Sequence, residues 1–206
     1  MILRYRYEKS LCGKAISRKI RTKMTVKDII YYSCLMCGKE ELAEKIADGA
    51  VPDLNPEIVR FLNCYNLTVM ELSEDIEPLV FKEALYSADG KYNYENFSKP
   101  PKEILSVTSD GKSVAFNVLP DKVETDVTHC EITYDYRAHR ATGLNETCEY
   151  DENVFSSRVL AMGVASEYLL ISGLYEEAMT WRERYEKAIE TFVIGKKRRI
   201  RGRVWA

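Results

Sequence analysis

Apolar residues follow a helical period at both ends of the chain and a strand-like alternation in its middle. The first periodic segment is TVKDIIYYSCLMCG. In it Thr25 can cap a helix, Asp28 stands where a capping box needs an acid, and Gly38 is a natural stop. Residues 39–48, KEELAEKIAD, predict a short charged helix closed by a glycine. Two helices are therefore expected in this first part of the chain.

A third helix is expected to begin at Asn55-Pro56. Asparagine is a good N-cap, and proline loses nothing at the first helical position, where its missing N–H has no partner in any case. The apolar residues that follow are spaced by four and three, which places them on one face, and the helix is expected to end within 73–78. The members of this face are Ile58, Leu62, Tyr65, Val69 and Leu72.

Between residues 79 and 138 the pattern becomes that of short β-strands. Segments rich in β-branched and aromatic residues are separated by turn residues, which predicts about four to six antiparallel strands. Asp110-Gly111 favours a tight hairpin, and Ala88-Asp89-Gly90 predicts another. In CEITYDYRA the alternation predicts one buried and one solvent-exposed face, the buried one carrying Ile132, Tyr134 and Tyr136.

Helical periodicity returns after a polar loop. Residues 154–171 are apolar almost all round, which is typical of a helix buried on most sides. Ser172-Gly173 predicts a turn, and an amphipathic helix is expected from there to Gly195, packed on its predecessor. The apolar stripe of this last helix consists of Leu174, Ala178, Trp181, Tyr185, Ala188 and Phe192.

These segments predict an α+β fold. N-terminal helices and a C-terminal helical pair form a helical bundle, and a small antiparallel β subdomain is inserted between them. Because MTVKDII has the form of a natural beginning, the first 23 residues are either an extension from an upstream start or a flexible arm. The predicted parts are 1–23, a basic extension; 24–78, the N-terminal helices; 79–138, the β subdomain; 139–194, the helical pair; and 195–206, a basic tail.

The net charge of −2 conceals an uneven distribution. Residues 1–23 hold eight Lys/Arg and one acid, and residues 196–203 hold six Lys/Arg and no acid. Removing these from the totals of 30 bases and 32 acids leaves 16 bases against 31 acids, so the body carries about −15. Such a body argues against wrapping DNA, because DNA binding needs cations that face the phosphates.

Candidate chemistry is sparse. Cys34 and Cys37 have the spacing of a zinc pair, but no second pair accompanies them, and the six scattered cysteines are expected mainly in the core. The chain has two histidines, His129 and His139, no glycine-rich phosphate loop and no catalytic motif. No catalytic, cofactor-binding or metal-ligating residue is predicted, and an enzyme is the least favoured class of function.

No apolar run approaches the length of a membrane span, and the N-terminus lacks the apolar block of a secretory signal. An intracellular protein with no membrane partner is therefore expected.

The C-terminal third, VFSSRVLAMGVASEYLLISGLYEEAMTWRERYEKAIE followed by KKRRIRGRVW, resembles the closing segment of head–tail connector (adaptor or neck) proteins of tailed bacteriophages. The order of elements is similar as well: a helix of the type TVKDIIYYSCLMCGKEEL, a second helix beginning NPEIVRFLNCYNL, a β stretch, a helical pair and a basic tail. The tail-tubular proteins of short-tailed phages are similar in the same way. The resemblance covers residues 24–206 and leaves residues 1–23 without a counterpart.

This resemblance implies a structural virion protein in the neck of the particle, assembled in the cytoplasm of a bacterial host and carrying no cofactor. About a dozen copies would form a ring below the portal protein and above a downstream tail or neck protein. DNA would pass through the ring without being read, since an acidic lumen repels phosphates. Charged faces of the last helix would meet neighbouring subunits, with Glu183, Arg184, Glu186 and Lys187 as candidates.

The tail GKKRRIRGRVWA is open to three interpretations: a nucleic-acid hook, a targeting signal or a strap that docks on another protein. Apolar residues interleaved with cations favour the strap, with Trp205 as its anchor. The predicted portal-docking residues are Lys196, Lys197, Arg198, Arg199, Ile200, Arg201, Arg203, Val204 and Trp205. The alternative function is a non-specific nucleic-acid-binding accessory protein that uses both basic ends, in which Tyr5 and Tyr7 could stack on bases.

Overall fold

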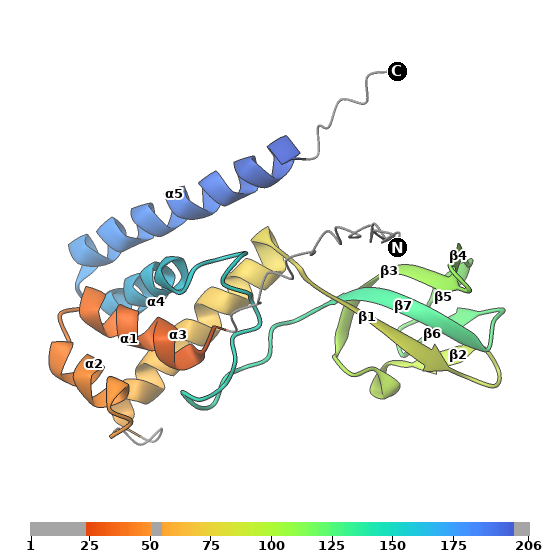
Figure 1. Cartoon of the computed structure of the whole chain (residues 1–206), viewed down its shortest axis with the longest axis horizontal. Coiled ribbons are helices and arrows are strands. Elements are labelled where there is room, and N and C mark those ends of the chain that lie inside the picture. The colour runs from red at the N-terminus through yellow and green to blue at the C-terminus, as the bar shows by residue number, and fades with distance from the viewer. Residues whose placement is uncertain (1–23, 51–54, 200–206) are drawn as a thin grey trace, which may run out of the picture.

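Helices gather at one end of an elongated molecule and strands gather at the other (Figure 1). The computed structural model describes residues 24–50 and 55–199, with side chains described as far as Ile194. The predicted α+β fold is confirmed: an antiparallel β unit is inserted in the sequence between N-terminal and C-terminal helices. The basic extension, residues 1–23, and the last seven residues of the tail lie outside the described residues.

The N-terminal helices begin and end where their capping residues predict. Thr25 and Asp28 form both halves of the capping box, and the Asn55 side chain accepts a hydrogen bond from the Glu57 N–H at 2.9 Å. The five apolar residues predicted on one face of the third helix are all buried. The helices are α1 (Val26–Met36), α2 (Glu40–Ala47) and α3 (Pro56–Glu71), and α3 runs directly into a five-residue π-helical segment, η1 (Leu72–Ile76).

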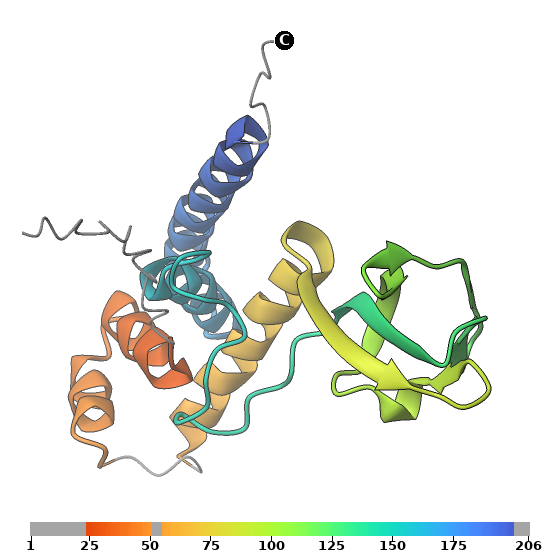
Figure 2. The same ribbon diagram turned by 45° about the vertical axis from the view of Figure 1, so that its right-hand side comes forward.

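The C-terminal pair is α4 (Ser157–Ile171) and α5 (Tyr175–Arg199). Helix α4 begins three residues later than the apolar run, because the Ser156 side chain caps it by accepting from the Val159 N–H. Helices α1, α3 and α5 all pack on α4. Figure 2 shows α5 rising away from the other helices toward its C-terminal end.

The prediction that the last helix ends at Gly195 is wrong. Helix α5 continues through Gly195 to Arg199, so that Lys196–Arg199 belong to the helix. A glycine in a helix interior costs about 1 kcal/mol relative to alanine, and the lysines and arginines that follow are good helix formers. The glycine alone therefore does not stop the helix.

The β unit consists of two antiparallel sheets. The larger has the order β1-β7-β3-β4, with β1 (Leu79–Tyr86) and β3 (Pro101–Ser109) on either side of the central β7 (His129–Tyr136). The smaller has the order β2-β6-β5. The remaining strands are β2 (Lys91–Asn93), β4 (Lys112–Ser113), β5 (Phe116–Val118) and β6 (Lys122–Thr125), and one 3₁₀ turn, η2 (Tyr94–Asn96), follows β2.

Of the two predicted hairpins, one is confirmed. Asp110 and Gly111 both have positive φ, 49° and 74°, and join β3 to β4 as a tight primed turn requires. The turn at Ala88-Asp89-Gly90 exists, but it makes no hairpin, because β1 pairs with β7 and β2 with β6. Seven strands form where about four to six were expected, since three of them have only two or three residues.

The buried face of β7 is the predicted one. Ile132, Tyr134 and Tyr136 are buried there, and the Tyr134 hydroxyl donates to Glu83 on β1. The opposite face departs from the prediction at Asp135, which is also buried and whose Oδ1 has no hydrogen-bond partner among the described residues.

Polar contacts at the junction hold the β unit against the helices. Glu149, in the loop before α4, accepts hydrogen bonds from the Lys99 Nζ at 3.1 Å and from the Tyr136 hydroxyl at 3.0 Å. The Lys99 Nζ also lies 5.2 Å from the centre of the Tyr136 ring. On the other side, Arg137 forms an ion pair with Glu74 in η1 at 3.6 Å. The two ends of the molecule are therefore tied at two points.

Replacing Gly163 by alanine tests how closely α4 and α5 approach. A Cβ at this position would lie 2.6 Å from the Thr68 Cγ2 and 3.0 Å from the Tyr185 ring. We expect Gly163→Ala to lower the free energy of unfolding by about 1–3 kcal/mol, as overpacking does. This would be measured by urea denaturation. In the Thr68→Ser background, which removes that methyl group, the loss should be smaller. A stabilised Gly163→Ala protein, as expected of a solvent-exposed helix position, would contradict the packing.

Candidate interaction surfaces

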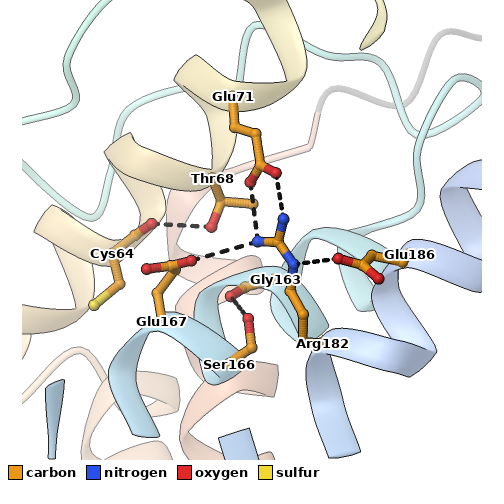
Figure 3. A network of polar contacts seen from close by, with 8 residues as sticks. All are labelled: Cys64, Thr68, Glu71, Gly163, Ser166, Glu167, Arg182 and Glu186. Carbon is orange, nitrogen blue, oxygen red and sulfur yellow. Dashed lines mark hydrogen bonds and ion pairs between the residues drawn. The ribbon is translucent and has the colours of Figure 1, made fainter. Parts of the chain in front are cut away.

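Arg182 is the centre of a cluster of charges that joins α5 to α3 and α4 (Figure 3). Its two terminal nitrogens contact both carboxylate oxygens of Glu71 at the end of α3, a bidentate arrangement. The Nε donates to Glu186 at 2.7 Å, and Nη1 lies 3.5 Å from Glu167 on α4. The hydrogen bonds that Arg182 donates to Glu71, with a further contribution from the one to Glu186, raise the pKa of Arg182 above its ordinary value.

Beside this cluster lies an open groove of about 480 Å³ between η1 and the second half of α5. Its apolar lining comes from Ile76, Ile189, Val193 and Ile194, together with the Tyr185 ring. Its carboxylates are Glu71, Asp75, Glu186 and Glu190. We call this the acidic groove, because it holds four carboxylates and a single cation, Arg182, that is already paired.

Three polar groups of the acidic groove have no partner among the described residues. Asp75 and Glu190 have no ion-pair partner among the described residues. Tyr185 lies against the groove with 1% of its surface exposed, and its hydroxyl has no hydrogen-bond partner in that part of the chain. Burial raises the pKa of Tyr185, so the hydroxyl is protonated and able to donate.

A second groove, of about 480 Å³, lies on the other flank of α5, and we call it the arginine groove. Arg158 and Arg184 supply its charge, and the Arg184 guanidinium lies 4.8 Å from the centre of the Trp181 ring. The spacing of two residues places Arg184 about 160° around the helix from Glu186, so the two side chains lie on different flanks of α5. The apolar lining of the groove comes from Tyr32, Leu35, Met36, Met162 and Trp181.

The turn between α4 and α5 exposes a run of large apolar side chains, which we call the apolar tip. Tyr175 is 65% exposed, and Ile171 and Met179 are each 58% exposed. Leu170 and Leu174 complete the run. Large apolar side chains exposed together in this way are typical of interaction sites. The tip lies at the end of the molecule away from the β unit (Figure 1).

The predicted subunit-interface residues on α5 are exposed, but one of them is engaged within the chain. Glu183 and Lys187 are exposed, Arg184 is exposed with its guanidinium over the Trp181 ring, and Glu186 accepts the hydrogen bond from Arg182. Of the predicted docking residues, Lys196, Lys197, Arg198 and Arg199 belong to α5, and their side chains are not described. Ile200, Arg201, Arg203, Val204 and Trp205 lie outside the described residues.

The apolar stripe predicted for α5 differs from the buried face of the helix at two positions. Leu174 is 46% exposed and precedes the helix, whereas Ile189, outside the predicted stripe, is buried. The reason is that α5 touches two partners: its first half packs on α4 and its second half faces Phe155 and η1, so the buried face widens.

The cysteines lie where the sequence places them. Cys34, Cys64, Cys130 and Cys148 are buried in the hydrophobic core, Cys37 is half-buried, and Cys12 lies outside the described residues. Burial raises the pKa of Cys34 and of Cys64 to about 12, so both remain neutral thiols at physiological pH. Among the described residues no group of three or more His, Cys, Asp or Glu could hold a metal ion.

Sequence reasoning missed the acidic groove and the role of Arg182. A signal was present, because Arg182 and Glu186 have the i, i+4 spacing of a helical ion pair. The contacts to Glu71 and Glu167 form only when α5 packs against α3 and α4. Local sequence patterns do not predict such tertiary contacts.

Comparisons with known proteins assign no family: no family model matches the chain, and no curated protein matches it significantly. Among the helices in residues 24–50 and 55–199, none combines the length and the apolar character that crossing a membrane requires.

Replacing Arg182 by methionine should lower the free energy of unfolding by about 1–2 kcal/mol, because Glu71 loses a bidentate partner in a half-buried place. Arg184→Met, two residues along the same helix, is the matched control. Arg184 contacts the Trp181 ring and forms no ion pair with any residue that the structure describes, so its loss should cost less than about 0.5 kcal/mol. Equal losses in urea denaturation of the two variants would contradict the role given to Arg182.

Proposed function

We propose that this protein is a subunit of a head–tail connector ring of a tailed bacteriophage, as the resemblance of residues 24–206 implies. The observation that carries the proposal is the apolar tip. A chain that exposes Ile171, Leu174, Tyr175 and Met179 together has a surface that a partner must cover. A protein that works as one copy in an assembly needs such a surface, whereas a monomeric enzyme does not.

A ring requires two different surfaces on each copy, one complementary to the other. The apolar tip is convex, and the arginine groove is concave with an apolar lining. We propose that the tip of one copy inserts into the arginine groove of the next, with Tyr175 as the central contact. Aromatic side chains that fill a partner's pocket dominate the binding energy of many interfaces.

Helix α5 supports the proposed role of the tail. The helix continues to Arg199, ten residues past the buried Ile189, and IRGRVWA follows in the sequence. We propose that this end reaches the portal protein, with Trp205 as the anchor and the lysines and arginines around it as the charged contacts. The acidic body, about −15, favours passage of DNA through the ring without adhesion.

Mixing the protein with the portal protein of the same phage tests this proposal. We expect negative-stain microscopy to show rings capped by a second layer, of about twelve copies if the ring matches the resemblance. Trp205→Ala should abolish the cap by removing the anchor, and Tyr175→Glu should do so by placing a charge in the subunit contact. Tyr86→Glu is the matched control, since Tyr86 is also exposed, at 73%, but lies in the β unit.

Absence of any complex with portal rings, together with no effect of deleting residues 195–206, would exclude the connector role. Titration with double-stranded DNA separates the alternative. Binding at low salt that falls steeply as salt is added would favour the nucleic-acid-binding accessory function, because each phosphate contact releases counterions. The connector role predicts no such binding by the acidic body.

A further inference from the structure

The acidic groove has the composition of a site for a basic peptide with apolar side chains. Aliphatic side chains line it, and two of its carboxylates lack an ion-pair partner among the described residues. The buried Tyr185 hydroxyl beside it has no hydrogen-bond partner in the same part of the chain. A segment that alternates cations and aromatic or aliphatic residues would cover the apolar lining and pair with Asp75 and Glu190. The tip-to-groove contact proposed above leaves this flank of α5 free.

The chain itself contains such a segment. Its first residues read MILRYRY, in which Arg4 and Arg6 alternate with Tyr5 and Tyr7. In an extended peptide this alternation places the two arginines on one side and the two tyrosines on the other. The two arginines match the two unpaired carboxylates in number. The whole segment 1–23 carries eight cations and one acid.

The point where this segment joins the described chain is linked to the groove lining through one loop, residues 148–155. The Met24 carbonyl accepts a hydrogen bond from the Cys148 N–H at 2.9 Å. Two residues further on, the Tyr150 hydroxyl donates to the carbonyl of Glu77, the residue after Ile76 of the groove lining, at 2.7 Å. The same loop contacts α5, because the Phe155 and Phe192 rings are 4.6 Å apart.

The segment before Met24 is long enough to reach along the whole groove. Seventeen residues separate Tyr7 from Met24, and extended chain spans about 3.3–3.6 Å per residue, which gives a reach of more than about 50 Å. The stretch of α5 that lines the groove, from Arg182 to Ile194, is about 18 Å long at 1.5 Å per residue. Because the segment is tethered, its effective concentration at the groove is high, and modest contacts are enough to hold it.

We propose that residues 2–7 of this chain bind in its own acidic groove, with Arg4 and Arg6 paired to Asp75 and Glu190 and the tyrosines against Ile189 and Val193. The tail of the same chain fits less well. It leaves from the far end of α5, which rises away from the body, and its apolar residues are not in alternation with its first cations (Figure 2). The inference does not depend on the connector role.

Photo-crosslinking in the full-length protein tests this directly. A benzoylphenylalanine at Ile194, which is 43% exposed at the edge of the groove, would be irradiated and the crosslinked peptides mapped by mass spectrometry. We expect crosslinks to residues 2–7. Mixing isotope-labelled with unlabelled chains should show that they form within one chain. The same probe at Tyr175, on the apolar tip, should give no crosslink to residues 2–7.

Charge reversal supplies the second arm. Asp75→Lys with Glu190→Lys should lower the crosslink yield by roughly threefold or more, the value of two exposed ion pairs. Reversal of Glu176 and Glu183, exposed acids of α5 that do not line the groove, should leave the yield unchanged. Adding Arg4→Glu and Arg6→Glu to the groove variant should restore the yield, because the pairs are re-formed with opposite signs.

Three results would overturn the proposal. Crosslinks that reach only residues 195–206 would assign the groove to the tail. Crosslinks that join labelled to unlabelled chains would assign it to a second copy. An absence of crosslinks at 150 mM salt, with the same result for the charge-swapped protein, would show that no segment of this chain occupies the groove.

Discussion

The close packing of three helices on the backbone of α4 is the contact on which the rest of the structure depends. Small side chains make it possible: Gly163 admits the Tyr185 ring of α5, and the Ala161 carbonyl accepts a hydrogen bond from Ser33 of α1. Phe61 of α3 stacks on Tyr168 with ring centres 4.0 Å apart. Because α1 and α3 come from one end of the chain and α5 from the other, α4 joins the two halves around the inserted β unit.

The position of the β unit follows from this arrangement. Strand β1 leaves the helices directly after η1, and the return path from β7 passes Arg137 and reaches the loop that holds Glu149. The junction between the helices and the β unit therefore has polar contacts on both connecting segments. Its geometry depends on a fixed position of the end of α3. The bidentate contact between Arg182 and Glu71 fixes that end against α5.

Local signals predicted most of the fold, because caps, turns and periodicity act over a few residues. The capping box at Thr25, the N-cap at Asn55 and the turn at Asp110-Gly111 all form as expected. What failed depends on distant partners. One example is the turn at Gly90, which forms no hairpin because β1 pairs with β7. The ion pairs of Arg182 are another. The apolar tip was missed for the opposite reason: a helical period assumes that the apolar face is covered, and at Leu174 nothing in the described chain covers it.

Because α5 continues through Gly195, residues 195–199 extend the helix and are not a flexible connection. A flexible strap would search a sphere around its attachment point, whereas a helix holds its end at a set distance and direction from the body. Ile189 is the last buried residue of α5 among those whose side chains are described, and from it to Arg199 the helix rises about 15 Å. Gly195 lies midway along that arm and is its softest point. The angle between the body of the protein and a partner bound at the end of α5 therefore depends on the backbone at Gly195.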